Sequence, residues 1–245
     1  MASKTPEEKL HNATERSLRL FIDFLQLQER YALLHPMLFD ESVQWQYGHR
    51  HQWHGFDAMR RSLFFSCCQD IYKLSCDRAR HHCVSIDKCM DDLNDHTVYQ
   101  QLKSRYIAAE LAIDEGHPDP LVAALDVARV PERTASYSDA FDRKCGEATA
   151  SWKEFLARPT LEACNTIRNE MTAHTRLQLI SPTLDPIDIT KLDIDLYDLK
   201  PTISAMQGLV SRISGVVRAQ DFAWQHNEQR YIRAAMNFWQ DKNGG

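Results

Sequence analysis

Apolar residues recur along most of this chain at the three- and four-residue spacing of helices with one buried face. Residues 5–34 show this spacing after a start made of Thr5, Pro6 and two glutamates. A threonine, a proline and early carboxylates are typical of a helix N-terminus. We expect the helix to end or break at His35 and Pro36, because a proline removes a hydrogen bond and restricts the residue before it.

The same periodicity predicts further helices over most of the remaining chain. They cover residues 55–80, 85–93, 98–114, 119–131, 137–156, 161–174 and 196–224, and the last is open to extension as far as 238. Ser85 is the expected N-cap of the second of these helices. Residues 181–186 predict a loop, and residues 187–195 suit either a short strand or an extended linker. We therefore predict an all-α antiparallel helical bundle with a loop or extended segment before the last long helix.

Composition supports one domain built from helices. Only 8 glycines and 9 prolines occur among 245 residues, and 43% of residues are hydrophobic, enough for a sizeable core. We expect a single domain over 1–245, with flexible ends at 1–5 and 240–245. The sequence has no apolar run of about 18 residues, so no membrane span is expected. The polar N-terminus and an odd number of cysteines, seven, favour a cytoplasmic protein with reduced thiols.

Net charge and metal-ligand spacing narrow the classes of function. The formal net charge of -5 disfavours a protein that coats nucleic acid without sequence specificity, because such a protein needs a surplus of basic residues. Two groups of side chains could bind a metal: His49, His51 and His54, and the set Cys76, His81, His82, Cys83 and Cys89. Neither group has the paired short spacings of a zinc site, so we predict no metal and no cofactor. A metalloprotein that uses one of these two groups is the alternative hypothesis.

The segment from Arg168 to His174 is the most informative part of the chain. Arg168 is a permanent cation whose planar fork matches phosphate, and His174 exchanges a proton near neutral pH. Asn169 can orient a neighbouring group through hydrogen bonds. A base, an acid and a cation are the groups needed to cleave RNA without a metal. The alternative is structural, with a surface arginine and a histidine that interacts favourably with the helix dipole.

Helix geometry limits what one copy of this segment can do. Six residues on an ideal helix turn through about 600°, which leaves Arg168 and His174 roughly 120° apart around the axis. One histidine also cannot act as acid and base at once. The two side chains could converge if the helix ends near Ala173, or if a two-fold dimer supplies two histidines and two arginines to one cleft. We therefore expect this segment to form half of a dimeric site.

Residues 167–174, Ile-Arg-Asn-Glu-Met-Thr-Ala-His, resemble the motif of HEPN domains, the "higher eukaryotes and prokaryotes nucleotide-binding" helical bundles. The form with Asn169 after the arginine and Ala173 before the histidine resembles the branch related to abortive infection protein U. An upstream helix with Arg60, Arg61 and Asp70, followed by a shorter helix, is also similar to that branch. The resemblance covers residues 10–220 in layout and implies a HEPN-like antiparallel helical bundle with additional helices.

The resemblance also implies a function. Many HEPN domains are metal-independent endoribonucleases, active as dimers in toxin–antitoxin or antiphage defence. By this resemblance Arg168 would stabilise the phosphorane, His174 would be the general acid or base, and Asn169 would be their polar partner. RNA, a second copy of the chain and an antitoxin protein are then the expected partners, with no membrane. Other members are inactive, so the alternative is a non-catalytic helical module that binds RNA, nucleotides or proteins.

Overall fold

The computed structural model describes residues 4–48, 52–76, 84–113, 120–177 and 194–240, and these residues are helical with short connections. No strand occurs among them. The elements are α1 (Pro6–Phe39), α2 (Glu41–Gly48), α3 (Trp53–Cys76), α4 (Ile86–Asn94), α5 (His96–Ile113), α6 (Pro120–Leu156), α7 (Pro159–Leu177), the short 3₁₀ helix η2 (Leu196–Asp198), α8 (Leu199–Arg218) and α9 (Trp224–Gln240). The prediction of an all-α fold is confirmed.

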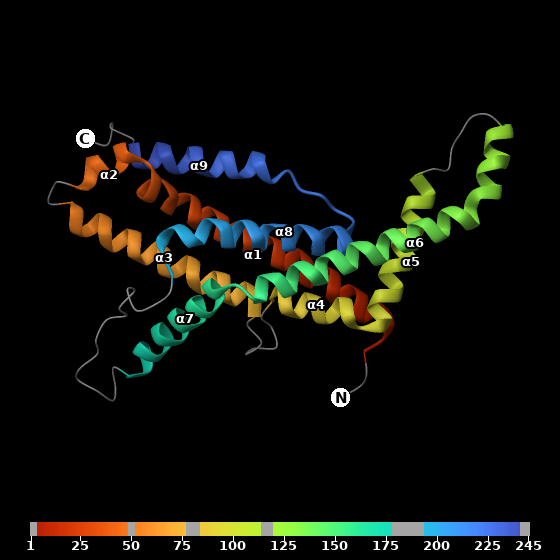
Figure 1. Cartoon of the computed structure of the whole chain (residues 1–245), viewed down its shortest axis with the longest axis horizontal. Coiled ribbons are helices and arrows are strands. Elements are labelled where there is room, and N and C mark those ends of the chain that lie inside the picture. The colour runs from red at the N-terminus through yellow and green to blue at the C-terminus, as the bar shows by residue number, and fades with distance from the viewer. Residues whose placement is uncertain (1–3, 49–51, 77–83, 114–119, 178–193, 241–245) are drawn as a thin grey trace.

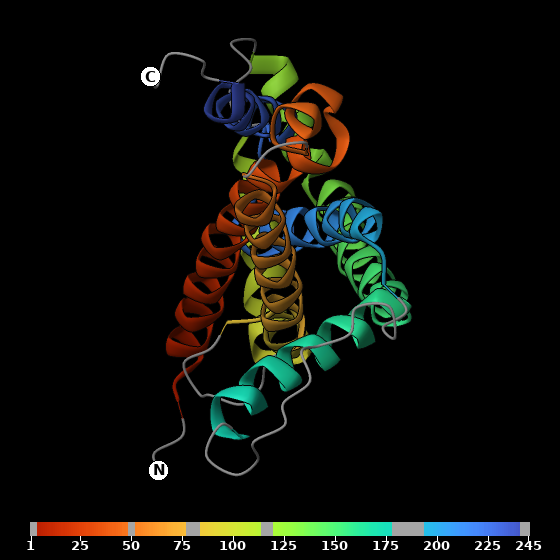
Figure 2. The same cartoon turned by 90° about the vertical axis from the view of Figure 1, so that its left-hand side faces the viewer.

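Helix α1 is the centre of the bundle. It contacts α3, α4, α5, α8 and α9, so elements from both halves of the sequence pack around it. Figure 1 shows α3 and α8 running back along α1, with α9 on the opposite side from α7. In Figure 2, turned by 90°, α2 and α9 lie together at the top and α7 lies below α3. The first part of α5 packs against α1 and α4, while its second part and the first part of α6 project beyond the bundle.

One continuous apolar core joins α1, α3, α4, α6, α7 and α8. Its largest fully buried side chains include Leu20, Phe24, Leu27, Phe64, Ile71, Phe141, Phe155 and Ile167. Burying side chains of this size contributes about 1.5–3 kcal/mol each relative to leaving them exposed. Such side chains recur at helical spacing along each element, which explains why the periodicity located the helices.

The two ends of α1 differ in how well the sequence predicted them. At its start, the Thr5 N–H donates to Glu8 Oε2 at 2.8 Å and the Glu8 N–H donates to Thr5 Oγ1 at 3.2 Å, which is a capping box. The predicted end at Pro36 is wrong, because α1 continues to Phe39. Pro36 has no backbone N–H to donate, but its carbonyl still accepts a hydrogen bond from the Asp40 N–H at 3.0 Å. Packing of the buried Met37 and Leu38 offsets the lost bond.

Two helices cover most of the described residues between 41 and 56. Helix α2 follows α1 directly, and α3 already begins at Trp53. A second small core forms where α1, α2, α3 and α9 meet, and it contains Met37, Val43, Phe56 and Trp239. Phe56 belongs to this small core and Tyr47 packs against it, whereas Trp45 and Trp53 are exposed.

Pro131 also fails to separate two helices. Helix α6 runs unbroken from Pro120 to Leu156, where two helices, 119–131 and 137–156, were predicted. A proline inside a helix removes one hydrogen bond and strains the preceding turn. Thr134 Oγ1 donates to the carbonyl of Val130 at 2.7 Å, which gives that exposed turn a local hydrogen bond.

The predicted N-cap Ser85 is confirmed, since Ser85 Oγ accepts from the Lys88 N–H at 3.3 Å.

The predicted last long helix is two helices. Helix α8 ends at Arg218, Ala219 adopts the left-handed conformation with φ of 52°, and α9 begins at Trp224. An alanine in that conformation stops a helix. The loop at 181–186 and most of the predicted extended segment lie outside the described residues, and Ile194 and Asp195 lead directly into η2. No helix among the described residues is long and apolar enough to span a membrane.

Candidate functional site

Helix α7 is anchored on α3 by its first half. Leu161, Ala163, Cys164 and Ile167 are buried, and α7 makes its main contact with α3. At 100° per residue these four positions fall within about 160° of the helix circumference, so they share one broad side of the helix. The next residues, Arg168 and Asn169, therefore follow immediately after a firmly packed turn.

Arg168 lies at the border between this packed side and the surface. Its guanidinium carbon lies 5.4 Å from the centre of the Tyr72 ring on α3, which is a cation–π contact. Its Nη1 donates to Asn169 Oδ1 at 3.5 Å, and Asn169 Nδ2 donates to Asn165 Oδ1 at 3.0 Å. The side chain is half-buried while Asn169 is exposed. The structure thus brings two of the three predicted residues together and adds Tyr72 beneath them.

His174 lies on the same helix, six residues after Arg168. Residues 170–177 belong to α7, but their side chains are outside the described part of the structure. The helical backbone confirms the assumption behind the 120° separation, that both residues are on one α-helix. The predicted pairing of Arg168 with His174 stays a prediction.

Tyr72 is the residue that the sequence interpretation missed. It lies on α3, almost a hundred residues before Arg168, and nothing local marks it. The upstream residues of the HEPN resemblance have other contacts. Arg60 and Arg61 both pair with Asp57, and Asp70 pairs with Arg30 of α1. Their ion pairs stabilise α3 and its contact with α1, on which the α7 site depends.

Cysteines lie beneath the site but lack the chemistry of nucleophiles. Cys67, Cys68 and Cys164 are fully buried where α3 meets α7. Burial raises the pKa of the Cys67 thiol to about 12 and that of Cys68 well above its ordinary value. A buried thiol that keeps its proton is inert, so these residues serve as core packing.

The two groups of side chains considered as metal ligands fall partly outside the described residues. His49, His51, His81, His82 and Cys83 all lie there. Of the others, His54 is exposed on α3, Cys76 is half-buried at its end, and Cys89 is buried in α4. Within the described part of the chain, no three metal-ligating side chains come together.

No curated protein and no solved structure matches the chain. The model of the HEPN_AbiU2 family, described as AbiU2, matches residues 7–238, from the first turn of α1 to the last turn of α9. The all-helical fold of the described residues agrees with that match. The chain belongs to the HEPN_AbiU2 family of abortive-infection-related helical proteins.

Proposed function

We propose that this protein is a metal-independent endoribonuclease acting in the cytoplasm in antiphage or toxin–antitoxin defence. The family supports the defence role. The observation that carries the enzymatic part is the placement of Arg168, half-buried beside Tyr72 and oriented by Asn169 on a helix anchored in the core. An arginine held in this way is preorganised for an anion and needs little reorganisation when the anion arrives.

The proposed reaction is attack of an RNA 2′-hydroxyl on the adjacent phosphorus. Arg168 stabilises the charge that develops on the phosphorane oxygens. His174 acts as general base or general acid, because its ordinary pKa lies near neutral pH. Asn169 keeps the guanidinium in place by accepting a hydrogen bond from it. The 2′-hydroxyl attacks and the 5′-oxygen leaves, so the products are a 2′,3′-cyclic phosphate and a free 5′-hydroxyl.

A homodimer would complete this site. One His174 supplies a base or an acid, and the reaction requires both. A two-fold interface at α7 would bring a second His174 and a second Arg168 to the same cleft. An antitoxin protein that covers α7 would then be the natural means of control.

The direct test is cleavage of total RNA by the purified full chain in EDTA, with Arg168→Ala and His174→Ala as separate variants. Arg143→Ala, which removes an exposed arginine on α6, and His54→Ala are matched controls. We expect cleavage by the wild type and by both controls, and loss of cleavage in the two site variants with unchanged circular dichroism. Cleavage that persists in His174→Ala contradicts the proposed chemistry. Saturable RNA binding without any cleavage favours a non-catalytic binding module.

A growth assay tests the defence role in the cell. Expression of the wild type is expected to arrest growth, and expression of His174→Ala is not.

Light scattering on the purified protein tests whether it is a dimer. A monomer at assay concentration that still cleaves RNA would exclude the shared site.

A further inference from the structure

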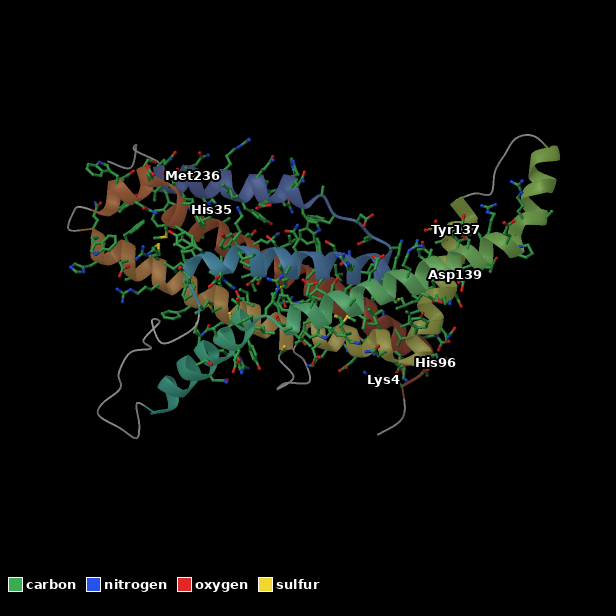
Figure 3. The ribbon with its side chains drawn as sticks, viewed as in Figure 1. Lys4, His35, His96, Tyr137, Asp139 and Met236 are labelled. Carbon is green, nitrogen blue, oxygen red and sulfur yellow. The ribbon has the colours of Figure 1, made fainter. Side chains whose placement is uncertain are left out.

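Two asparagines, Asn165 and Asn169, lie next to Arg168 on α7. A spacing of four residues places their side chains one turn apart on the same face of the helix, and Arg168 follows Asn165 by three residues. Asn165 is half-buried and comes directly after the fully buried Cys164, so its backbone belongs to the part of α7 that is anchored on α3. Figure 3 shows α7 and its side chains on the side of the bundle away from the labelled Met236 of α9.

A chain of hydrogen bonds joins these three residues. Asn169 Nδ2 donates to Asn165 Oδ1 at 3.0 Å, and Arg168 Nη1 donates to Asn169 Oδ1 at 3.5 Å. An asparagine side chain has one end that donates and one end that accepts, and the two ends exchange places when the amide turns by about 180°. Because Asn165 holds the donating end of Asn169, the accepting end faces the guanidinium. Without Asn165, nothing in this chain of hydrogen bonds stops Asn169 from turning its NH₂ group toward another donor.

The stability of α7 does not explain why asparagine occurs at both positions. Asparagine is among the weaker helix formers and alanine is the strongest, so alanine at either position would favour the helix more. The Asn169 side chain is exposed, so it adds nothing to the core. Its amide is also uncharged, so its hydrogen bond orients Arg168 without neutralising the guanidinium, whereas carboxylates hold Arg30 and Arg60. Both features fit a role in anion recognition.

We propose that Asn165 is a positioning residue of the Arg168 site, which acts through Asn169 to hold the guanidinium toward an RNA phosphate. Asn165 does not itself contact the phosphate. It fixes which end of the Asn169 amide faces Arg168, and Asn169 in turn fixes the guanidinium. This role rests on the proposed function, because the anion is the RNA phosphate that Arg168 is proposed to stabilise.

Two substitutions at position 165 test the role of its acceptor. Asn165→Ala removes the acceptor and is expected to lower kcat for RNA cleavage about fivefold, the change that corresponds to one hydrogen bond. Asn165→Gln keeps an amide that can accept from Asn169 across one helical turn, and is expected to restore most of the wild-type kcat. The Tm of Asn165→Ala is expected to equal or exceed that of the wild type. Asn237→Ala, which removes an exposed asparagine of α9, is the matched control and leaves kcat unchanged.

A double-mutant cycle tests the order of the three residues. If Asn165 acts only through Asn169, Asn165→Ala lowers kcat in the wild-type background and has no further effect in the Asn169→Ala background. Three results would overturn the positioning role. They are a wild-type kcat in Asn165→Ala, additive losses in the double variant, and an Asn165→Gln variant as slow as Asn165→Ala.

Binding of RNA with 2′-O-methyl riboses separates this role from the proposed function, because such RNA cannot be cleaved by attack of a 2′-hydroxyl. Measured by fluorescence anisotropy, Asn165→Ala is expected to weaken binding of this RNA in the wild-type background and to change nothing in the Arg168→Ala background. This pattern in a protein that cleaves no RNA would keep the positioning role and reject the proposed function. Cleavage that needs Arg168 but proceeds at the wild-type rate in Asn165→Ala would do the reverse.

Discussion

The α3–α7 face and a small pocket between α1, α8 and α9 place their polar side chains in opposite ways. At the first, the buried residues are apolar or cysteine, and the polar residues Arg168 and Asn169 lie at or near the surface. At the second, Gln28 and Tyr31 are buried and the charges of Lys200 and Glu228 are exposed. The first arrangement suits a large polyanion that approaches a rigid surface. The second leaves the Gln28 amide oxygen and the Tyr31 hydroxyl buried between helices, without a hydrogen-bond partner among the described residues.

The largest expected difference between the two regions is in stability. Ile167→Ala should reduce the free energy of unfolding by about 2–5 kcal/mol, because it opens a cavity in a fully packed contact. Ile203→Ala should cost less, because this side chain already borders open space in the pocket. Urea denaturation of both variants measures the difference. Equal losses would show that the pocket wall is packed as tightly as the α3–α7 contact.

The next effect concerns catalysis. Arg168→Ala should reduce the rate of RNA cleavage by about 10²–10³-fold, the usual cost of removing one donor that stabilises a developing charge. Tyr31→Phe should leave that rate unchanged, since Tyr31 lines the other region. Initial rates on one RNA substrate measure both variants. A large rate loss in Tyr31→Phe would join the two regions into one functional unit.

A pH titration separates the regions further. Burial and the nearby Lys200 lower the pKa of His35 from its ordinary value of 6.5, while Glu228 opposes them. The unfolded chain therefore takes up the proton first, and stability that is present above pH 6.5 is lost as the pH falls below it. The loss is at most about 1.4 kcal/mol per pH unit for one group. Urea denaturation between pH 7.5 and 5 should show a flatter profile for His35→Gln than for the wild type, with an unchanged slope arguing against this assignment.

The smallest effects come from two tyrosines. Tyr31→Phe should change the free energy of unfolding by less than about 1 kcal/mol, and toward greater stability, because it removes a buried hydroxyl that has no hydrogen-bond partner among the described residues. Tyr72→Leu should lower RNA cleavage by a few-fold, because a cation–π contact contributes about 0.5–1 kcal/mol at a partly exposed site. Tyr72→Phe keeps the ring and should restore most of the rate. A Tyr72→Phe variant as slow as Tyr72→Leu would mean that the hydroxyl matters rather than the ring.

The sequence predicted the helices well because their apolar spacing is a local property. The capping box at Thr5 and the N-cap at Ser85 are equally local, and both are confirmed. Pro36 and Pro131 were misread as helix ends because packing and continuous helix on both sides outweigh one lost hydrogen bond. The break after Arg218 was missed because Ala219 is a good helix former whose left-handed conformation is imposed by the fold.

The candidate site could be predicted only in part, because only part of it is local in the sequence. Arg168 and Asn169 were identified because they form a continuous motif on one helix. Tyr72 was missed because it reaches Arg168 only through the packing of α7 on α3. The pocket had no signal at all, since Gln28, Lys200 and Glu228 are ordinary surface residue types in the sequence and are brought together only by the reversal between α8 and α9.

The contact of α9 with α1 has a consequence for the order in which the molecule is made. The indole N–H of Trp239 donates to the carbonyl of Leu33 at 3.0 Å, across 206 residues. Gln44 Nε2 also donates to the carbonyl of Leu38 at 2.8 Å, so the last turn of α1 depends on side chains made after it. During synthesis, α1 therefore leaves the ribosome long before α9, its last contact along the chain, has been made. The pocket and the contact of α9 with the end of α1 both need residues near the C-terminus, so neither can form before almost the whole chain has been synthesised.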